Sequence, residues 1–325
     1  MTVIIGVEST AHTLSVSVVK DDEVLSNEKK SYETGKGGMV PSKVSNHHVR
    51  YSKQVLRNAI RKSGISIEDV DGVAFSQSPG IGNCLRIGSV IARTLQMRLD
   101  VPLLPVNHCI AHIEIGKSET NAEDPVFLYA SGANTQIINY ENSKYRIYGE
   151  TEDMGVGNFL DSVGRKIGLG FPAGPKIEEL AKKTDEYYRL PYSVKGMDII
   201  LGGIFSHVKQ SMLNKYDKEV IANSIQETVF AMLVEVTERA VAHSGKDEVL
   251  IGGGVGCNNR LKEMLRTMCE ERDVSFYSPS NEFLVDNGAM IARTGVLLYE
   301  SGKSFSHKEL RIDPDRRPDD VEIPY

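Results

Sequence analysis

Two stretches of the chain carry the same succession of hydrophobic and polar positions. Residues 3–31 have the pattern of a buried strand, a polar turn, an alternating strand and, after a second polar turn, a third strand. Residues 125–150 repeat this plan about 120 residues later. Each predicted meander is followed by segments that alternate between helical periodicity and short apolar runs. The pattern predicts a duplicated α/β protein with a cleft between its two halves.

The polar stretch "GKSETNAED" separates the two units and predicts the domain boundary. We therefore expect a first domain over residues 1–118 and a second over residues 119–301. The last helical segment, near residues 287–300, could pack back on the first domain. Residues 302–325 are polar and punctuated by proline, which predicts a tail or linker.

Composition is that of an ordinary globular protein, with 40% hydrophobic and 25% charged residues. The first ten residues lack the basic flank of a signal or transit peptide, so we expect a cytoplasmic protein without membrane contact. The cysteines are scattered and form no CxxC pair, which predicts reduced core residues rather than disulfides or a zinc knuckle. They are Cys84, Cys109, Cys257 and Cys269.

A net charge of −6 argues against a protein that grips nucleic acid over a broad surface by itself. An RNA substrate would need a local basic patch or a partner protein. One candidate patch is the series Arg50, Lys53, Arg57 and Arg61, spaced to share one side of a helix. The alternative is the solvated face of an amphipathic helix.

Several turns have the residues that bind phosphates. "VEST" ends the first strand with Ser9 and Thr10, and "YASGANT" ends the strand of the second meander in the same way. "IGGGVGCNN" gives a strand, a glycine-rich turn and a helix start at which Asn258 could cap the helix or bind a ribose or base. The glycine spacing matches neither GxGxxG nor a P-loop. A nucleotide between the two halves is therefore expected, without a Rossmann fingerprint.

His108 and His112 lie four residues apart, so on a helix both could reach one metal ion. The HExxH pattern of zinc proteases needs a glutamate after the first histidine, where this chain has Cys109. Candidates for a third ligand are Asp286 and Tyr129. Partly buried or capping histidines are the alternative to a metal site.

Several segments, taken together, resemble the Kae/TsaD/Qri family of tRNA N6-adenosine threonylcarbamoyltransferases. They are "AFSQSPGIGNCLRIG", "VNHCIAHIEIG", "LYASGANTQ", "GNFLDSVGRKIGLGFPAGPKIE", "LPYSVKGMD", "GGGVGCNNRL" and "DNGAMIARTG". The resemblance covers about residues 3–300 and implies the ASKHA (actin, sugar kinase, Hsp70) fold. Two segments look like the archaeal and eukaryotic branch that works within the KEOPS complex. Ala133 and Ala173 stand where the family usually has glycine.

The resemblance implies a metal-assisted acyl transfer. His108, His112 and Asp286 would hold iron or zinc, with Tyr129 as a further ligand. The substrate, threonylcarbamoyl-AMP, would donate its threonylcarbamoyl group to N6 of the adenosine adjoining the anticodon, in tRNAs that read codons beginning with A. ATP could occupy the same site. The binding residues implied are Tyr129, Ala130, Ser131, Gly132, Ala133, Asp161, Gly174, Glu178 and Asn258.

The partners implied are tRNA, a small kinase-like ATPase and a small dimerising subunit. The kinase would be a separate chain or would be fused after a linker such as residues 302–325. Two other functions are considered beside the transferase. A non-catalytic ATP-binding scaffold would lose the site motifs, which are present, and a metalloprotease would need the glutamate that Cys109 replaces.

Overall fold

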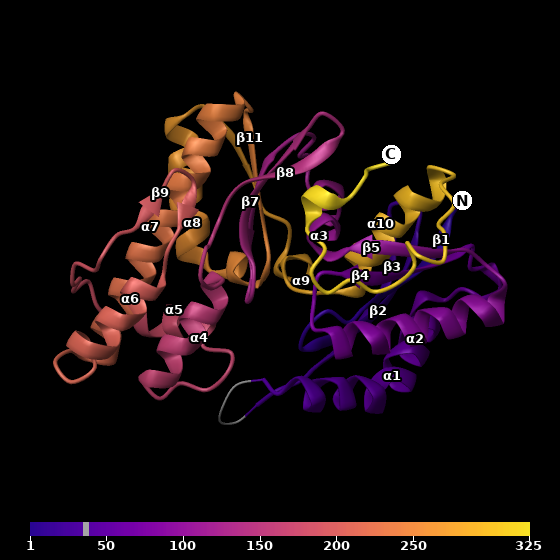
Figure 1. The fold of residues 1–325 in the computed structure, drawn as a ribbon, viewed down its shortest axis with the longest axis horizontal. Helices are drawn as coiled ribbons and strands as arrows, with labels where there is room; N and C mark the ends of the chain where they lie inside the picture. The colour runs from indigo at the N-terminus through magenta and orange to yellow at the C-terminus, as the bar shows by residue number, and fades with distance from the viewer. Residues whose placement is uncertain (35–38) are drawn as a thin grey trace.

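The computed structural model describes residues 1–34 and 39–325, which form two α/β halves (Figure 1). The first half is built on a sheet in the order β3-β2-β1-β4-β5. β1 pairs antiparallel with β2 and parallel with β4, and β5 continues the parallel part. Its strands are β1 (Val3–Glu8), β2 (Thr13–Lys20), β3 (Glu23–Ser31), β4 (Gly72–Ser78) and β5 (Leu103–Asn107).

The second sheet repeats the first, with the order β8-β7-β6-β11-β12. β6 again pairs antiparallel with the next strand of its meander and parallel with a strand that follows a helical segment. The predicted duplication is confirmed. The strands are β6 (Val126–Ala130), β7 (Thr135–Glu141), β8 (Lys144–Glu150), β11 (Glu248–Gly252) and β12 (Ser275–Tyr277), and β9 (Val194–Lys195) and β10 (Asp198–Ile199) form a separate small hairpin.

Helices cover both faces of the first sheet. α1 (Pro41–Ser63) and α2 (Gly82–Leu99) pack on the face that carries Ile5 and Val16. α10 (Gly288–Glu300) packs on the opposite face, so the last long helix of the chain joins the first half. It lies so close to β1 that a Cβ built on Gly6 would be 2.3 Å from the backbone nitrogen of Ala292. Glycine at this position therefore permits the direct approach of helix and strand.

The remaining long helices cover one face of the second sheet and form its core. One π-helical turn, η2 (Val208–Met212), and one 3-10 segment, η3 (Gly254–Cys257), lie between these helices. Two more 3-10 segments lie elsewhere: η1 (Ile67–Asp69) in the first half and η4 (Pro318–Asp320) near the end of the chain. The helices of this half are α4 (Val156–Lys166), α5 (Gly174–Ala181), α6 (Gly202–His207), α7 (Lys218–Ser244), α8 (Asn259–Glu271) and α9 (Asn281–Leu284). By length and composition α7 could cross a membrane, but 72% of its most apolar window is buried, as in a core helix.

α3 (His108–Glu119) lies between the two sheets. Ala111 and Ile115 pack against β5 and α10 of the first half, whereas Ile110 and Ile113 pack against β6 and β11 of the second. A helix that is covered on opposite sides carries apolar residues all round and not only along one stripe. The sequence "CIAHIEI" of α3 has this distribution. The helix that carries the two histidines is thus held by both halves.

The segment expected to be a tail or linker, residues 302–325, packs along the protein. Gln77 Nε2 donates to the carbonyl of Arg311 (2.7 Å), and Arg317 pairs with Glu150 of the second half (3.0 Å). Tyr325 Oη reaches Glu114 of α3 at 3.4 Å. Figure 1 shows this last segment passing the first half and ending beside α3. This polar segment docks through backbone and side-chain hydrogen bonds to the folded domains. Because a hydrophobicity pattern does not reveal such bonds, the sequence predicted a tail or linker.

Candidate metal centre and nucleotide cleft

Two asparagine-capped helix starts deliver the histidines and the aspartate to one place. The side chain of Asn107 accepts from the backbone N–H groups of Cys109 and Ile110 and so caps α3, which begins at His108. Asn287 caps α10 by accepting from Met290 N–H (3.0 Å), and Asp286 immediately precedes this cap. Local capping chemistry therefore fixes where the candidate ligands lie.

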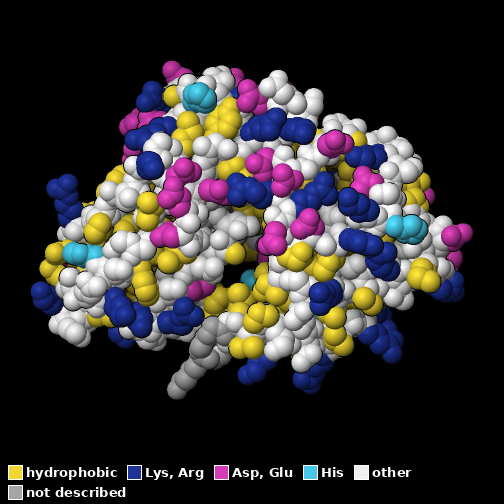
Figure 2. All heavy atoms as spheres, viewed as in Figure 1, with side chains coloured by type: hydrophobic (Ala, Val, Ile, Leu, Met, Phe, Trp, Pro, Cys, Tyr) yellow, Lys and Arg dark blue, Asp and Glu magenta, His cyan; other side chains and the backbone are white. Residues whose placement is uncertain are grey.

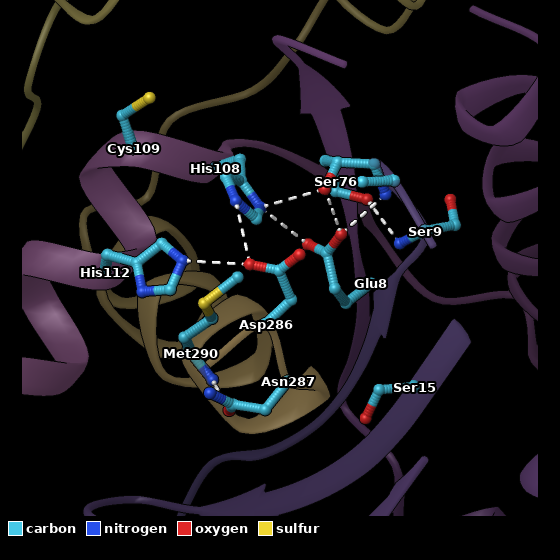
Figure 3. A network of polar contacts seen from close by, with 12 residues as sticks. Glu8, Ser9, Ser15, Ser76, His108, Cys109, His112, Asp286, Asn287 and Met290 are labelled. Atoms are coloured by element: carbon cyan, nitrogen blue, oxygen red, sulfur yellow. Dashed lines mark hydrogen bonds and ion pairs between the residues drawn. The ribbon is translucent and has the colours of Figure 1, made fainter. Parts of the chain in front are cut away.

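The three candidate ligands converge as the sequence predicted (Figure 3). Asp286 Oδ1 lies 3.4 Å from His108 Nε2 and 3.3 Å from His112 Nε2. One donor atom from each residue lies within 4.8 Å of the others. Two ligands about 2.0–2.1 Å from a tetrahedral metal ion are about 3.3–3.4 Å apart, so both separations fit such an ion. Two imidazoles and one carboxylate are also a donor set that divalent transition metals favour.

A buried carboxylate that the sequence analysis did not single out completes the geometry. Glu8 is fully buried at the end of β1, and its Oε2 lies 3.0 Å from His108 Nδ1. Its other oxygen accepts from the backbone N–H (2.5 Å) and the hydroxyl (2.6 Å) of Thr10. A carboxylate on one imidazole nitrogen fixes the tautomer in which the other nitrogen is free to bind metal. Glu8 therefore presents Nε2 of His108 to the centre.

The electrostatics of this cluster favour a positive charge. Burial opposes protonation of His108, but Glu8 and Asp286 raise its pKa to about 10. Burial, assisted by the neighbouring His108, lowers the pKa of His112. Although burial acts in the other direction, the two histidines hold the pKa of Asp286 well below its usual range. Two carboxylates around a buried imidazole thus retain a proton, and a divalent metal ion would supply the same positive charge.

The neighbours of the cluster have different roles. The ring of Tyr129 is 5.1 Å from that of His112 and 6.4 Å from that of His108, and burial raises the pKa of its phenol. It lies beside the candidate ligands, and its ligand role stays a prediction. Cys109 points away from the cluster (Figure 3), and burial raises the pKa of its thiol to about 12. It does not stand in for the glutamate of a zinc protease.

Two of the turns expected to bind phosphate, the one after β6 and the glycine-rich one after β11, lie against each other. Figure 2 shows a hollow between the two halves of the protein. The turn after β6 packs on the start of α4: Gly157 N donates to Ser131 O (3.0 Å) and Asn158 N to Gly132 O (2.8 Å). The glycine-rich turn after β11 lies against it, because a Cβ built on Gly253 would be 2.4 Å from Ala130 O. Gly253 has φ +87°, which favours glycine. Ala130, Ser131, Gly132 and Ala133 thus line one end of the second sheet beside the metal centre.

The remaining predicted substrate residues lie on the helices next to these turns. Asp161 of α4 accepts from Ala173 N–H (2.7 Å), which ties it to the turn before α5. Gly174 begins α5, and no atom lies within 4 Å of a Cβ built there. Ala173 is buried in the core, so its methyl group packs inward. The hydrogen bond from Ala173 to Asp161 holds α4 against the turn before α5. Substrate binding by Asp161 and Gly174 stays a prediction.

Glu178 and Asn258 connect α5 and α8. Glu178 Oε1 accepts from Asn259 Nδ2 at 3.1 Å. Asn258 caps α8 through Oδ1, donates from Nδ2 to Gln226 (3.0 Å), and is 8% exposed. Both ends of its side chain are therefore engaged within the protein. The capping role considered for Asn258 is confirmed, and its contact with a nucleotide stays a prediction.

Comparison with known proteins identifies the family. Residues 23–293 match the model of the family TsaD, tRNA N6-adenosine threonylcarbamoyltransferase. The chain belongs to this family. A TsaD relative from Thermococcus kodakarensis, with the name tRNA N6-adenosine threonylcarbamoyltransferase, is 48% identical over 98% of each chain. A relative from Methanosarcina mazei, named a probable bifunctional tRNA threonylcarbamoyladenosine biosynthesis protein, is 48% identical over all of this chain and 60% of its own length.

Solved structures agree with the TsaD assignment at the level of the fold. The T. kodakarensis HypF structure superposes with a TM-score of 0.67 at 16% identity, covering 95% of this chain and 49% of that one. The activator of 2-hydroxyisocaproyl-CoA dehydratase from Clostridium difficile gives 0.55 at 14% identity, covering 94% and 100%. The fold is the predicted ASKHA fold. The chain spans 60% of the length of the Methanosarcina relatives that it matches.

For this member of the TsaD family, sequence reasoning missed the residues that support the ligands. Glu8, Asn107 and Asn287 have no motif of their own. The available signal is chemical: Glu8 is an acidic residue at the end of a strand that is otherwise apolar, and a buried carboxylate needs a partner. The identity of that partner depends on α3, which lies about 100 residues further along the chain.

Proposed function

We propose that this protein synthesises N6-threonylcarbamoyladenosine in tRNA, with threonylcarbamoyl-AMP as the donor. The acceptor is the adenosine adjoining the anticodon in tRNAs that read codons beginning with A. Family membership and relatives of nearly equal length that carry this activity in their names support the proposal. The observation that carries it is the convergence of His108, His112 and Asp286 beside the cleft turns.

The reaction is an acyl transfer: N6 bonds to the carbamoyl carbon and gives up one proton to solvent. The bond from that carbon to the phosphate oxygen breaks, and AMP departs with the electron pair. The metal, iron or zinc, would be held by the three donors and supply a Lewis acid for charge that develops on oxygen. Glu8 orients His108 through Nδ1, so that the ligand set is preorganised. A side-chain nucleophile is not required.

The donor would bind in the cleft, where ATP would also fit. In this proposal the turn of residues 130–133 and the glycine-rich turn after β11 receive its phosphate through backbone N–H groups. Asp161 and Glu178 accept hydrogen bonds from ribose hydroxyls, and Gly174 lets the ligand approach the start of α5. Tyr129 lies close enough to the histidines to contact either the metal or the acyl group.

A protein with a net charge of −6 would need partners that help to bind tRNA. We expect a KEOPS-like assembly in the cytoplasm, with a small kinase-like ATPase and a small dimerising subunit. The Methanosarcina relatives, which are longer and carry "bifunctional" in their names, support a kinase fused or bound to this chain.

The test compares His108→Ala with the unaltered protein in the presence of partner proteins. Metal content is measured by mass spectrometry after anaerobic purification, and N6-threonylcarbamoyladenosine is measured in purified tRNA. The proposal expects loss of both metal and product. Unchanged metal content and activity would refute it, and a scaffold without catalysis would give no product even with the unaltered chain. His307→Ala is a control histidine variant, because His307 is exposed and lies outside the metal centre.

A further inference from the structure

A second pocket, separate from the metal centre, opens where β3 ends and α1 begins. Its volume is about 520 Å³, and we call it the α1 pocket. Its lining combines basic side chains with flat rings, together with one carboxylate, Glu33. The basic and aromatic residues are Lys30, Tyr32, Lys43, His47, Arg50 and Tyr51.

The rings of the α1 pocket are already held in position. His47 lies 4.7 Å from Tyr51 and 5.7 Å from Tyr32, measured between ring centroids. Lys30 Nζ and Arg50 Cζ lie over the Tyr51 ring at 5.4 and 5.6 Å. Burial, and then the charges of Lys30 and Arg50, lower the pKa of His47. All three rings are half-buried, and two cations lie over that of Tyr51.

The cations of the α1 pocket have no acidic partner among the described residues. In the described parts of the chain, Lys30, Lys43 and Arg50 form no ion pair with a carboxylate within 4.0 Å. Lys62, at the other end of α1, does pair with Glu28 (2.6 Å). Three unpaired cations beside a single carboxylate make a local basic patch on a protein that is acidic as a whole. Such a patch attracts a polyanion.

The α1 pocket is connected to the metal centre through the turn between β1 and β2. Tyr32 N donates to His12 O (2.8 Å), and His48 Nε2 hydrogen-bonds Ala11 O (2.9 Å). On the other side of the same turn, Thr10 Oγ1 lies 3.3 Å from His108 Nδ1. The α1 pocket and the metal centre thus contact the same turn of the chain, residues 10–12, from its two sides.

We propose that the α1 pocket binds single-stranded RNA next to the reactive adenosine. The identity of that RNA rests on the proposed function. Phosphates lie on Lys30, Lys43 and Arg50, and a base stacks against His47 and Tyr51. Cations beside flat rings match the phosphate and base that repeat along a single strand. An acidic peptide would use the cations and leave the rings without a partner.

The test uses a triple variant of the full chain, Lys30→Ala/Lys43→Ala/Arg50→Ala. The matched control, Lys53→Ala/Arg57→Ala/Arg61→Ala, removes the same charge from exposed positions of α1 that do not line the pocket. Each chain is first combined with its partner proteins, and binding of a tRNA transcript is then measured by fluorescence anisotropy between about 50 and 200 mM salt. We expect the pocket variant to bind at least about tenfold more weakly and to lose about 2 units of salt slope, at about 0.7 per single-strand phosphate.

His47→Ala tests the stacking contribution, for which we expect about fivefold weaker binding or more without a change in salt slope. Metal content and thermal midpoint are measured for every variant and should equal those of the unaltered chain. With tRNA at saturating concentration the pocket variant should keep its kcat for threonylcarbamoyl transfer and show a raised KM.

Several results would overturn the proposal. They are a pocket variant with unaltered affinity and salt slope, a control variant that loses as much as the pocket variant, and an unaltered chain that does not bind tRNA. A pocket variant that releases a partner protein but retains tRNA would assign the surface to that protein instead. If the RNA-binding results contradict this proposal but threonylcarbamoyl transfer occurs, the proposed function still stands. If RNA binds as expected but no threonylcarbamoyl transfer occurs, only the proposed function is refuted.

Discussion

The support that Glu8 gives to His108 can be tested by the nearly isosteric change Glu8→Gln. In the structure one Glu8 oxygen accepts from the N–H and hydroxyl of Thr10, and the other faces His108 Nδ1 at 3.0 Å. A glutamine carbonyl can keep the Thr10 contacts. Its NH2 group then faces Nδ1 and donates to it, so the imidazole proton moves to Nε2, the nitrogen that should bind metal.

The expected effect follows from the role of such partners. Removing the hydrogen-bond partner of a metal-binding histidine costs about 10- to 100-fold in metal affinity. This corresponds to about 1.4–2.7 kcal/mol. The upper part of the range is expected here, because Glu8 is fully buried and water cannot replace it. The loss of negative charge beside a cation acts in the same direction.

The assay is a competition titration with a chelator of known affinity, with iron and zinc tested separately under anaerobic conditions. Glu28→Gln is the matched control, since it removes one carboxylate from an ion pair with Lys62, away from the candidate metal ligands. An affinity of Glu8→Gln within twofold of that of the unaltered protein, with the fold intact, would refute the tautomer argument.

Three further predictions concern the fold around the centre. Asn107→Ala removes the cap of α3 and should lower the free energy of unfolding by about 1 kcal/mol, measured by urea denaturation with Asn58→Ala as a surface control. Gly253→Ala places a methyl group 2.4 Å from Ala130 O at φ +87° and should destabilise by about 1–3 kcal/mol or abolish folding, whereas an unchanged midpoint would contradict the packing described. In chelator-treated protein the His108 pKa is raised from 6.5 to about 10, so its stabilisation is complete below pH 6.5 and is lost as pH rises through 10. Thermal midpoints should therefore fall across this window, and less so in Glu8→Gln.

Sequence patterns were sufficient for the duplicated architecture because each meander begins with a short apolar strand, continues through a polar turn into further strands, and recurs along the chain. The strand order of the two sheets does not follow from this pattern, because β4 and β11 pair with the first strand of each meander and not with the last. Two features depend on long-range packing instead. The polar segment over residues 302–325 docks through backbone carbonyls, and α3 is shared by both halves.

The metal ligands could be anticipated in part. His108 and His112 share a helix face by spacing alone, but Asp286 follows from the family resemblance, since 174 residues separate it from His112. Glu8 could not be assigned, because the sequence does not say which distant side chain a buried carboxylate will meet. For Asn258 the sequence left two roles open, because asparagine suits both a helix cap and a ligand contact.

The most direct test of the account is stepwise return of metal to chelator-treated protein during threonylcarbamoyl transfer. Purified tRNA, threonylcarbamoyl-AMP and the partner proteins are supplied, and product is measured against bound iron or zinc. The account predicts that transfer rises in proportion to occupancy and saturates at one metal ion per chain, and that Asp286→Asn lacks this response. Full transfer by metal-free protein would contradict it.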